Sequence, residues 1–174
     1  MHKIILIVGA SGVGKDTLIK GAQSKIDANF SKRYITRIPD DNEDNFFVDK
    51  DAFLLLKEND FFISTWEAHG NFYGISKNQI KEGLNIISIS RNAIKDFEDY
   101  FEDVTCLNIT LSKDELKKRL VRRNRETKEE IEKRISRSYP KIDAKNVIEF
   151  DNSKSIEESS ADFIKIIQGI KNQK

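Results

Sequence analysis

Apolar and polar residues alternate along this chain in a way that predicts strands and helices in turn. Residues 4–8 are five consecutive apolar side chains without polar alternation, which is typical of a central strand buried on both faces. Shorter apolar runs predict further strands at 84–90, 104–109 and 147–150. Because amphipathic stretches separate these runs, the pattern favours an α/β fold in which crossover helices connect parallel strands.

Three capping boxes predict where helices begin, because a Ser or Thr with a Glu three residues later satisfies two backbone donors at a helix start. We expect one helix from 112 to about 123, a second from 127 to about 138 that stops before Pro140, and a C-terminal helix from 155. The capping pairs are Ser112 with Glu115, Thr127 with Glu130, and Ser155 with Glu158.

Residues 33–76 break the alternation of predicted strands and helices, which indicates an insertion between two strands of the sheet. Aromatic and β-branched runs predict short strands at 34–36, 46–48 and 61–63, with a brief helix over 53–57. The acidic, Asn-rich stretch 40–45 carries no core-forming residue, so we expect a surface loop there.

Composition indicates a single domain over residues 1–174, with 38% hydrophobic and 34% charged residues. Thirty Lys and Arg against 29 Asp and Glu give a net charge of +1, so the electrostatic field that draws basic proteins to nucleic acid or membranes is missing.

No apolar run is long enough for a membrane span or an export signal. The lone cysteine, Cys106, predicts a core thiol in a reducing compartment. We therefore expect a cytoplasmic monomer or homodimer with neither nucleic acid nor membrane as a partner.

A phosphate-binding loop follows the first strand directly. The segment matches the pattern G-x-x-x-x-G-K, in which backbone N–H groups at a helix N-terminus surround a phosphate and a lysine reaches its oxygens. Strand, glycines, lysine and helix in this order predict ATP binding. The candidate ATP-binding residues here are Gly9, Ala10, Ser11, Gly12, Val13, Gly14, Lys15, Asp16 and Thr17.

One position departs from that pattern. Asp16 stands where a Ser or Thr hydroxyl normally coordinates Mg²⁺, and its carboxylate would supply a hard oxygen ligand or hold the waters of the ion. Thr17 offers a hydroxyl next to it. We take both as candidate metal-binding residues. The alternative is that Asp16 is a favourable acidic residue in the first turn of the helix.

Arginines elsewhere predict a second phosphate site. Arg33 and Arg37 flank the predicted strand 34–36, and strand alternation would place both on one face, where they could grip an anionic acceptor. The alternative is that they are solvated arginines at the edge of a sheet.

A basic run at 117–125 is followed one helix later by two more arginines. Intervening glutamates interrupt the surface, which counts against a nucleic-acid interface. In phosphoryl transfer, arginines close over the triphosphate and stabilise its charge. We therefore expect a helical lid whose candidate catalytic residues are Arg119, Arg123, Arg134 and Arg137. An ordinary solvated face is the alternative.

The order of these segments resembles the guanylate kinase superfamily over nearly the whole chain. The matching segments are 9–17, 33–37, 66–74 and 119–137. The resemblance implies a P-loop kinase with a five-stranded parallel core, an acceptor-binding insertion at about 33–76 and an arginine lid at about 112–139.

The residues that would read a guanine base are nevertheless missing. Ser64, Ser88 and Ser90 stand where that superfamily carries acidic residues, Arg33 replaces a serine, and Asp40 replaces a phosphate-binding arginine. A purine would then leave polar groups unpaired, which disfavours guanylate kinase proper.

These departures resemble ribose 1,5-bisphosphate phosphokinase, in Gly14-Lys15-Asp16, in 33–37, in 66–74 and in Ser90-Arg91. The strand end reads Ser-Ile-Ser-Arg where that family tends to carry Asn-Gly before Ser-Arg. The resemblance implies Mg²⁺-dependent transfer of the γ-phosphate of ATP to the 1-phosphate of ribose 1,5-bisphosphate, which gives phosphoribosyl diphosphate. Such a small acceptor carries two phosphates and no base.

On this interpretation Lys15 bridges the donor phosphates, and Arg33, Arg37 and Arg91 hold the acceptor. Asp151 and Asn152 follow the last predicted strand and are expected to border the adenine.

Trp66 and Tyr73 either pack against the sugar or belong to the core. Two rival functions stay open at this point. One is a guanylate or other nucleoside monophosphate kinase, and the other is a non-catalytic guanylate-kinase-like module that binds phosphopeptides.

Overall fold

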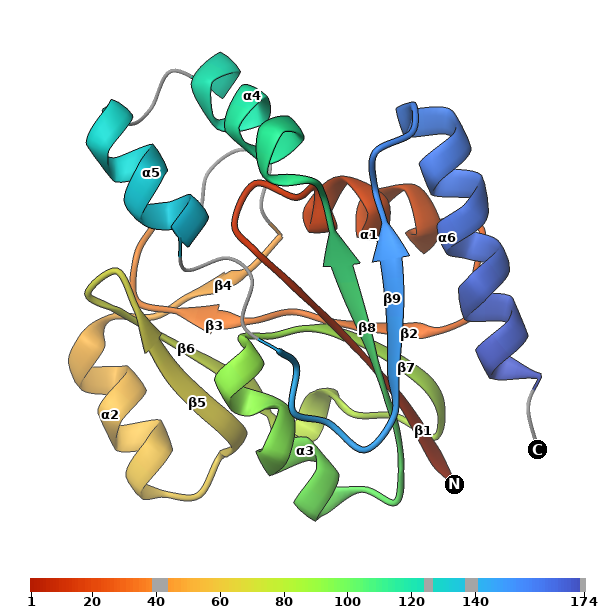
Figure 1. Ribbon diagram of the computed structural model, residues 1–174. Helices are drawn as coiled ribbons and strands as arrows, with labels where there is room; N and C mark the ends of the chain where they lie inside the picture. The colour runs from red at the N-terminus through yellow and green to blue at the C-terminus, as the bar shows by residue number, and fades with distance from the viewer. Residues whose placement is uncertain (39–43, 124–126, 137–140, 173–174) are drawn as a thin grey trace.

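The computed structural model describes residues 1–38, 44–123, 127–136 and 141–172 of the chain. A five-stranded sheet with strand order β2-β7-β1-β8-β9 forms its centre, and every neighbouring pair is parallel (Figure 1). This confirms the predicted α/β fold. The strands are β1 (His2–Gly9), β2 (Asn29–Ser31), β7 (Gly83–Ser88), β8 (Asp103–Thr110) and β9 (Val147–Asp151).

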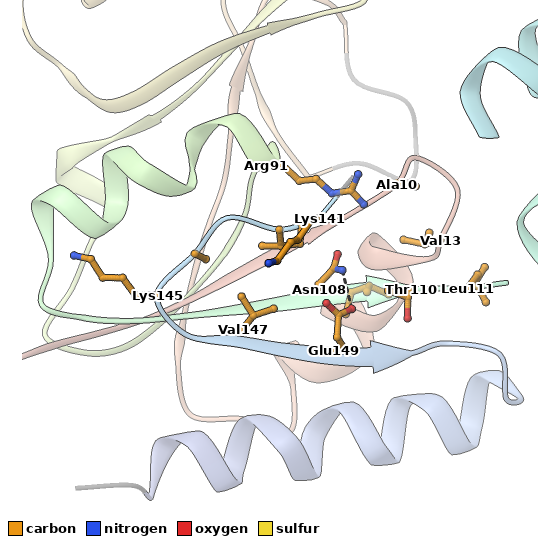
Figure 2. A pocket seen from close by; sticks show the side chains of 13 residues that line it. Ala10, Val13, Arg91, Asn108, Thr110, Leu111, Lys141, Lys145, Val147 and Glu149 are labelled. Carbon is orange, nitrogen blue, oxygen red and sulfur yellow. Dashed lines mark hydrogen bonds between the residues drawn. The ribbon is translucent and has the colours of Figure 1, made fainter. Parts of the chain in front are cut away.

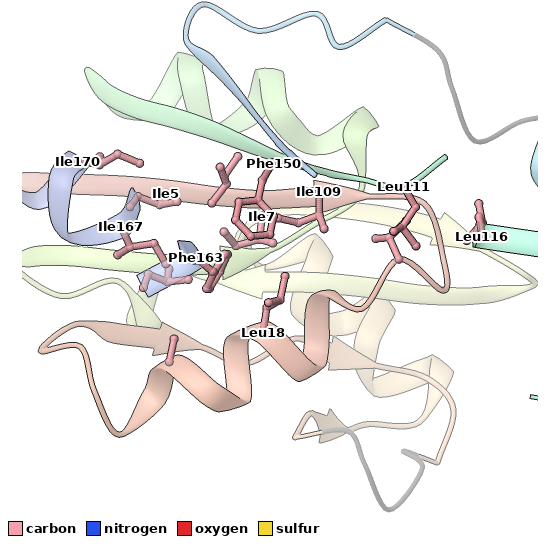
Figure 3. Packing of buried hydrophobic residues seen from close by; sticks show 14 of the residues in the cluster. Ile5, Ile7, Leu18, Ile109, Leu111, Leu116, Phe150, Phe163, Ile167 and Ile170 are labelled. Atoms are coloured by element: carbon pink, nitrogen blue, oxygen red, sulfur yellow. The ribbon is translucent and has the colours of Figure 1, made fainter. Parts of the chain in front are cut away.

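The central strand β1 is buried on both faces, as its continuous apolar run predicts. Residues 4–8 are each 0% exposed. Ile5 and Ile7 face a cluster that includes side chains of the flanking helices (Figure 3). Ile4 and Leu6 face a second cluster on the other side of the sheet. The strand therefore joins two cores and carries the loop that follows it into the middle of the molecule.

Helices cover both faces of this sheet (Figure 1). Helices α1 (Lys15–Gln23) and α6 (Ile156–Lys171) pack on one face, and α3 (Ile94–Tyr100) packs on the other. A capping box at Ser155 and Glu158 starts α6, as predicted. Two short 3₁₀ helices, η1 (Lys77–Gln79) and η2 (Arg91–Ala93), flank β7.

The insertion forms a separate four-stranded sheet with strand order β4-β3-β6-β5. It comprises β3 (Tyr34–Ile35), β4 (Phe46–Phe47), α2 (Lys50–Glu58), β5 (Phe62–Ala68) and β6 (Asn71–Ser76). Its interior is aromatic: the ring of Phe53 stacks on Phe62 and on Phe72, with centroids 4.7 and 5.7 Å apart. This region thus has a small hydrophobic interior of its own.

Two helices form the region predicted as a lid, α4 (Lys113–Arg123) and α5 (Lys128–Ser136). Thr127 and Glu130 make both hydrogen bonds of a capping box at the start of α5. Leu116 and Leu120 of α4 belong to the same buried cluster as Ile131 of α5. The pair is therefore anchored to the main core next to the carboxyl end of the sheet.

Several predicted boundaries were wrong. Strand β2 was not predicted, because a three-residue edge strand carries no readable pattern. The strand predicted at 84–90 ends at Ser88, and the one at 34–36 ends at Ile35. The strand predicted at 61–63 extends to Ala68, and β6 follows through a tight turn in which His69 and Gly70 have φ of 53° and 73°. Most of the predicted loop at 40–45 lies outside the described residues.

In the parts of the chain that the structure describes, no helix is both long and apolar enough to cross a membrane.

Candidate active site

The phosphate-binding loop connects the carboxyl end of β1 to the N-terminus of α1, where backbone N–H groups favour an anion. The Lys15 ammonium donates to the carbonyl oxygens of Gly9 and Ala10 at 2.8 and 3.1 Å. It therefore lies against the first residues of the loop. The lysine, the loop and the helix N-terminus thus lie together, and their role in phosphate binding stays a prediction.

Two glycines allow the loop to approach its neighbours closely. Gly12 and Gly14 have φ of 96° and 99°, which side chains rarely adopt. A Cβ on Gly14 would lie 2.7 Å from the Asn152 amide nitrogen, and one on Gly12 would lie 2.8 Å from Leu120. The glycine pattern is thus explained by packing of the loop against α4 and the β9–α6 loop, as well as by its curvature.

The carbonyl oxygen of Val13 joins three segments of the chain. It accepts hydrogen bonds from the Asn152 amide nitrogen at 2.6 Å and from Arg119 Nη1 at 3.2 Å. Arg119 Nη2 also donates to the backbone oxygen of Asn152 at 2.7 Å. The phosphate-binding loop, α4 and the β9–α6 loop are therefore held together by one small network.

A cavity of about 410 Å³ adjoins this network, and we call it the donor cavity. Asn152 lines it, whereas the Asp151 carboxylate accepts hydrogen bonds from Ser153 and does not. The sequence analysis did not identify Arg122 and Lys154 as residues of this cavity. Arg122 follows Arg119 by three residues on α4, and this spacing could have indicated that both lie on the same face of the helix. The lining includes Gly12, Gly14, Thr17, Arg119, Arg122, Asn152 and Lys154.

A second cavity, of about 400 Å³, lies between α1, β7 and the start of the insertion, and we call it the acceptor cavity. Arg33 Nη2 lies 3.7 Å from Asp16 Oδ1, and Arg33 Nε donates to Asn45 Oδ1 at 3.1 Å. Lys20 and Lys32 also line it. A guanidinium on the acceptor side thus lies next to the first turn of the phosphate-binding helix.

Ser88 contributes a buried hydroxyl to the acceptor cavity. Its side chain is 8% exposed, and its Oγ has no hydrogen-bond partner among the described residues. Buried polar groups are normally paired, so an unpaired hydroxyl lining a cavity indicates a position that a ligand could satisfy.

The buried hydroxyl of Ser64 is paired within the protein. Ser64 donates to the Asp96 carboxylate of α3 at 2.6 Å and is 3% exposed. At two of the positions where the superfamily carries acidic residues, the chain therefore has buried serine hydroxyls.

Two residues predicted for the acceptor site, Arg37 and Arg91, lie outside the acceptor cavity, and their contact with an acceptor stays a prediction. Arg37 donates to the carbonyl oxygen of Ile38 at 3.3 Å and does not line the acceptor cavity. Strand alternation cannot place it with Arg33, because β3 contains only Tyr34 and Ile35. Arg91 lines a different cavity, because β7 ends at Ser88 and Arg91 is the first residue of η2.

Trp66 and Tyr73 form a stacked cross-strand pair. Their ring centroids are 5.7 Å apart and their planes differ by 5°. Trp66 packs against the second hydrophobic cluster, and both side chains are half-buried. Trp66 therefore makes the core contact that was one of the two alternatives. Contact of either ring with a sugar stays a prediction.

The two candidate metal residues point to different cavities. Asp16 is exposed and lines the acceptor cavity, whereas Thr17 lines the donor cavity. In the described part of the chain, no three His, Cys, Asp or Glu side chains form a metal cluster. Mg²⁺ in kinases is usually held by one or two carboxylates together with substrate phosphates and waters. A single carboxylate beside the phosphate-binding loop fits that requirement.

The predicted lid arginines are only partly described. Arg119 belongs to the network at Val13, as given above. Arg137 and the side chains of Arg123 and Arg134 lie outside the described residues.

Comparison with known proteins agrees with this geometry. The family model of guanylate kinase matches residues 1–169. The chain is 35% identical to the ribose 1,5-bisphosphate phosphokinase PhnN of Rhizobium etli, over 96% of this chain and 90% of that protein. It is 33% identical to the protein of the same name from a Ruegeria species, over 95% and 91%. The crystal structure of guanylate kinase from Anaplasma phagocytophilum superposes with a TM-score of 0.67 at 22% identity and covers 99% of this chain and 87% of its own.

Proposed function

The chain belongs to the guanylate kinase family, and we propose that within this family it phosphorylates ribose 1,5-bisphosphate with ATP. The γ-phosphoryl group of ATP is transferred to an oxygen of the 1-phosphate, which gives ADP and 5-phosphoribosyl 1-diphosphate. The names of the similar proteins from Rhizobium etli and Ruegeria supply the acceptor. Both sequences cover nearly the whole chain.

The observation that carries this proposal is the chemistry of the acceptor cavity. Its lining offers the Arg33 guanidinium, Lys20, Lys32 and the unpaired hydroxyl of Ser88. Its two carboxylates, Asp44 and Asp16, already lie 2.6 Å from Lys32 and 3.7 Å from Arg33. Cations bind phosphates, whereas a carboxylate that could accept hydrogen bonds from a guanine edge is missing at Ser64 and Ser88. An acceptor made of phosphates and hydroxyl groups satisfies this lining better than a purine nucleotide does.

On the donor side, the phosphates of ATP would lie in the phosphate-binding loop. The N–H groups at the start of α1 and the Lys15 ammonium would hold the β- and γ-phosphates. The Arg119 guanidinium donates hydrogen bonds to two backbone carbonyl oxygens. It therefore acts as a positioning residue that fixes the loop and the wall of the donor cavity.

Arg122 and Lys154 also line the donor cavity, where their charges would favour the nucleotide phosphates, although the Lys154 ammonium is shared with Asp162 at 2.7 Å.

The transfer needs no strong general base. A phosphate monoester has its second pKa at about 6, so the attacking oxygen is already anionic at neutral pH. The protein has to align the two phosphates in line and neutralise their combined charge. Arg33 would hold the acceptor phosphate within reach of the first turn of α1, because its guanidinium lies 3.7 Å from Asp16.

Asp16 would hold the Mg²⁺ that accompanies ATP, directly or through a water of the ion. Bound there, the ion would neutralise charge on the donor phosphates. The exposed Asp16 carboxylate next to the loop fits this role, and its neighbour Arg33 would compensate the remaining negative charge of the acceptor.

The test is ADP release by the purified protein with ATP and Mg²⁺, comparing ribose 1,5-bisphosphate with GMP and dGMP as acceptors. We expect turnover with the sugar bisphosphate at least 100-fold above that with either nucleotide. Phosphorus NMR of the product should show the coupled signals of a diphosphate. Lys15→Met is the inactive control, with an expected fall in kcat of about 10²–10³-fold or more, because one charge-stabilising donor is lost.

Strong turnover of GMP without turnover of the sugar would replace this proposal with a nucleoside monophosphate kinase. If ATP with Mg²⁺ failed to raise the melting temperature, a non-catalytic module would become the better interpretation.

A further inference from the structure

A third cavity, of about 560 Å³, lies beside the carboxyl-terminal half of β8 and the first residues of β9, and we call it the lateral cavity (Figure 2). Strand residues form one side, the segment 141–145 forms another, and the phosphate-binding loop borders it. Its volume falls within the range of about 300–1,000 Å³ that is usual for small-molecule sites. The lining residues that matter here are Ala10, Arg91, Asn108, Lys141, Lys145 and Glu149.

A buried amide oxygen faces the lateral cavity without a partner. Asn108 is 6% exposed, and its Nδ2 donates to the Glu149 carboxylate at 2.8 Å (Figure 2). This bond fixes the orientation of the amide. Asn108 Oδ1 then has no hydrogen-bond donor among the described residues. Because buried carbonyl groups are normally paired, the oxygen indicates a place for a ligand hydroxyl or amine.

The charges around this amide select the sign of the ligand. Among the described lining residues, Arg91, Lys141 and Lys145 are cationic and only Glu149 is anionic. Lys145 Nζ also donates to the carbonyl oxygen of Glu98 at 3.3 Å, and the Glu98 carboxylate, which is not part of the lining, accepts from the Lys145 backbone N–H at 2.6 Å. Three cations against one carboxylate disfavour a metal ion and favour an anion, and guanidinium and ammonium groups bind phosphate well.

We propose that the lateral cavity binds a phosphate monoester that carries hydroxyl groups, such as a pentose monophosphate. The phosphate would be held by Arg91 and Lys141. A hydroxyl group would donate to Asn108 Oδ1, and a second could reach the Glu149 carboxylate. The ligand therefore satisfies the unpaired oxygen and the excess positive charge together.

This site is distinct from the two already described. The lateral cavity shares no described lining residue with the donor cavity or the acceptor cavity. It does border the phosphate-binding loop at Ala10. A ligand there would lie next to the loop without using Arg33 or Asn152, and it would be a molecule separate from ATP and from the acceptor.

The experiment is a calorimetric titration of the full chain with ribose 5-phosphate, inorganic phosphate and ribose, in the presence of a saturating non-hydrolysable ATP analogue with Mg²⁺. We expect ribose 5-phosphate to bind at least tenfold more tightly than inorganic phosphate, and ribose alone to show no binding. Lys141→Gln should weaken ribose 5-phosphate binding about tenfold, because a charge-assisted contact is lost. Asn108→Ala should lower its affinity to that of inorganic phosphate.

Matched variants separate the lateral cavity from the acceptor cavity. Lys165→Gln removes a lysine from the exposed side of α6 and should leave binding unchanged, whereas Arg33→Gln should affect only ribose 5-phosphate that enters the acceptor cavity. Melting curves check that each variant folds, and Lys141 is exposed, so its variant keeps the test valid if Asn108→Ala unfolds. Absence of ribose 5-phosphate binding, or binding lost in Arg33→Gln but intact in Lys141→Gln, would overturn the proposal. Neither result depends on whether the protein turns over ribose 1,5-bisphosphate.

Discussion

The side-chain amide of Asn152 donates a hydrogen bond of 2.6 Å to the backbone carbonyl of Val13, across 139 positions of sequence. This bond joins the loop after the last strand to the phosphate-binding loop after the first. Asn152 is 6% exposed, so the bond is shielded from water. The shape of the phosphate-binding loop therefore depends on a residue near the other end of the chain.

Asn152→Ala should consequently weaken both folding and ATP binding. Loss of the buried donor is expected to lower the free energy of unfolding by about 1–3 kcal/mol. The affinity for ATP should fall about tenfold, which corresponds to roughly 1.4 kcal/mol. Urea unfolding and calorimetric titration with ATP measure the two effects. Asn172→Ala, at the exposed end of α6, is the control, and an unchanged ATP affinity in Asn152→Ala would contradict the role of the bond.

Comparison of Gly14→Ala with Gly83→Ala separates the effect of steric crowding from that of backbone strain. Its new Cβ would lie 2.7 Å from the Asn152 amide nitrogen at φ 99°, whereas at Gly83, with φ 86°, nothing lies within 4 Å. Both variants should lose about 1–2 kcal/mol from the left-handed conformation. Only Gly14→Ala should also lose ATP binding, as measured by the shift in melting temperature that ATP produces. Equal ATP shifts in the two variants would show that the contact with Asn152 is unimportant.

Arg33→Gln and Arg37→Gln test which arginine serves the acceptor. Arg33 lines the acceptor cavity beside Asp16 and Arg37 does not, so we expect Arg33→Gln to raise the KM for the acceptor about 10–100-fold, roughly 1.4–2.7 kcal/mol. The KM for ATP should change little. Arg37→Gln should have less than a threefold effect on either. Steady-state kinetics with both substrates varied give the four constants, and equal effects of the two substitutions would favour the arrangement expected from strand alternation.

Cys106 should make stability depend on alkaline pH. Burial, together with the charges of Glu149 and Glu98, raises the pKa of its thiol from 9.0 to about 12. Between these values the unfolded chain releases the thiol proton while the folded chain keeps it, so stability falls as pH rises. Urea unfolding at pH 8 and at pH 10.5 should show a larger loss for the natural chain than for Cys106→Ala. Lysine deprotonation affects both proteins equally and therefore cancels in the comparison. An equal loss of stability in the two proteins would contradict the raised pKa of Cys106.

The parts of the structure that depend on local sequence were largely predictable. The apolar run at 4–8 predicted the central strand, and the glycines and lysine after it predicted the phosphate-binding loop. Both signals come from neighbouring residues whose pattern has one structural solution. The helix starts at Thr127 and Ser155 were predictable for the same reason, because a capping box is a local arrangement.

The distribution of the arginines among the cavities was not predictable in the same way. Arg33 and Arg91 were assigned to one site because each resembles an acceptor-binding residue, yet they line different cavities. Their separation depends on where β7 ends and how η2 turns, which is a tertiary property. Asn108 and Glu149 gave no signal in sequence, because neither belongs to a recognisable motif, and only the pairing of β8 with β9 brings them together.

The aromatic interior of the insertion gives this lobe contacts that do not depend on the central sheet. Phe62 and Phe72 each stack on Phe53, and none of the three belongs to the two clusters around the central sheet. Ile75 and Trp66, by contrast, join the insertion to the second of these clusters. Truncation of one of the three rings is therefore expected to loosen the outer part of the lobe while the strands that carry the phosphate-binding loop keep their packing.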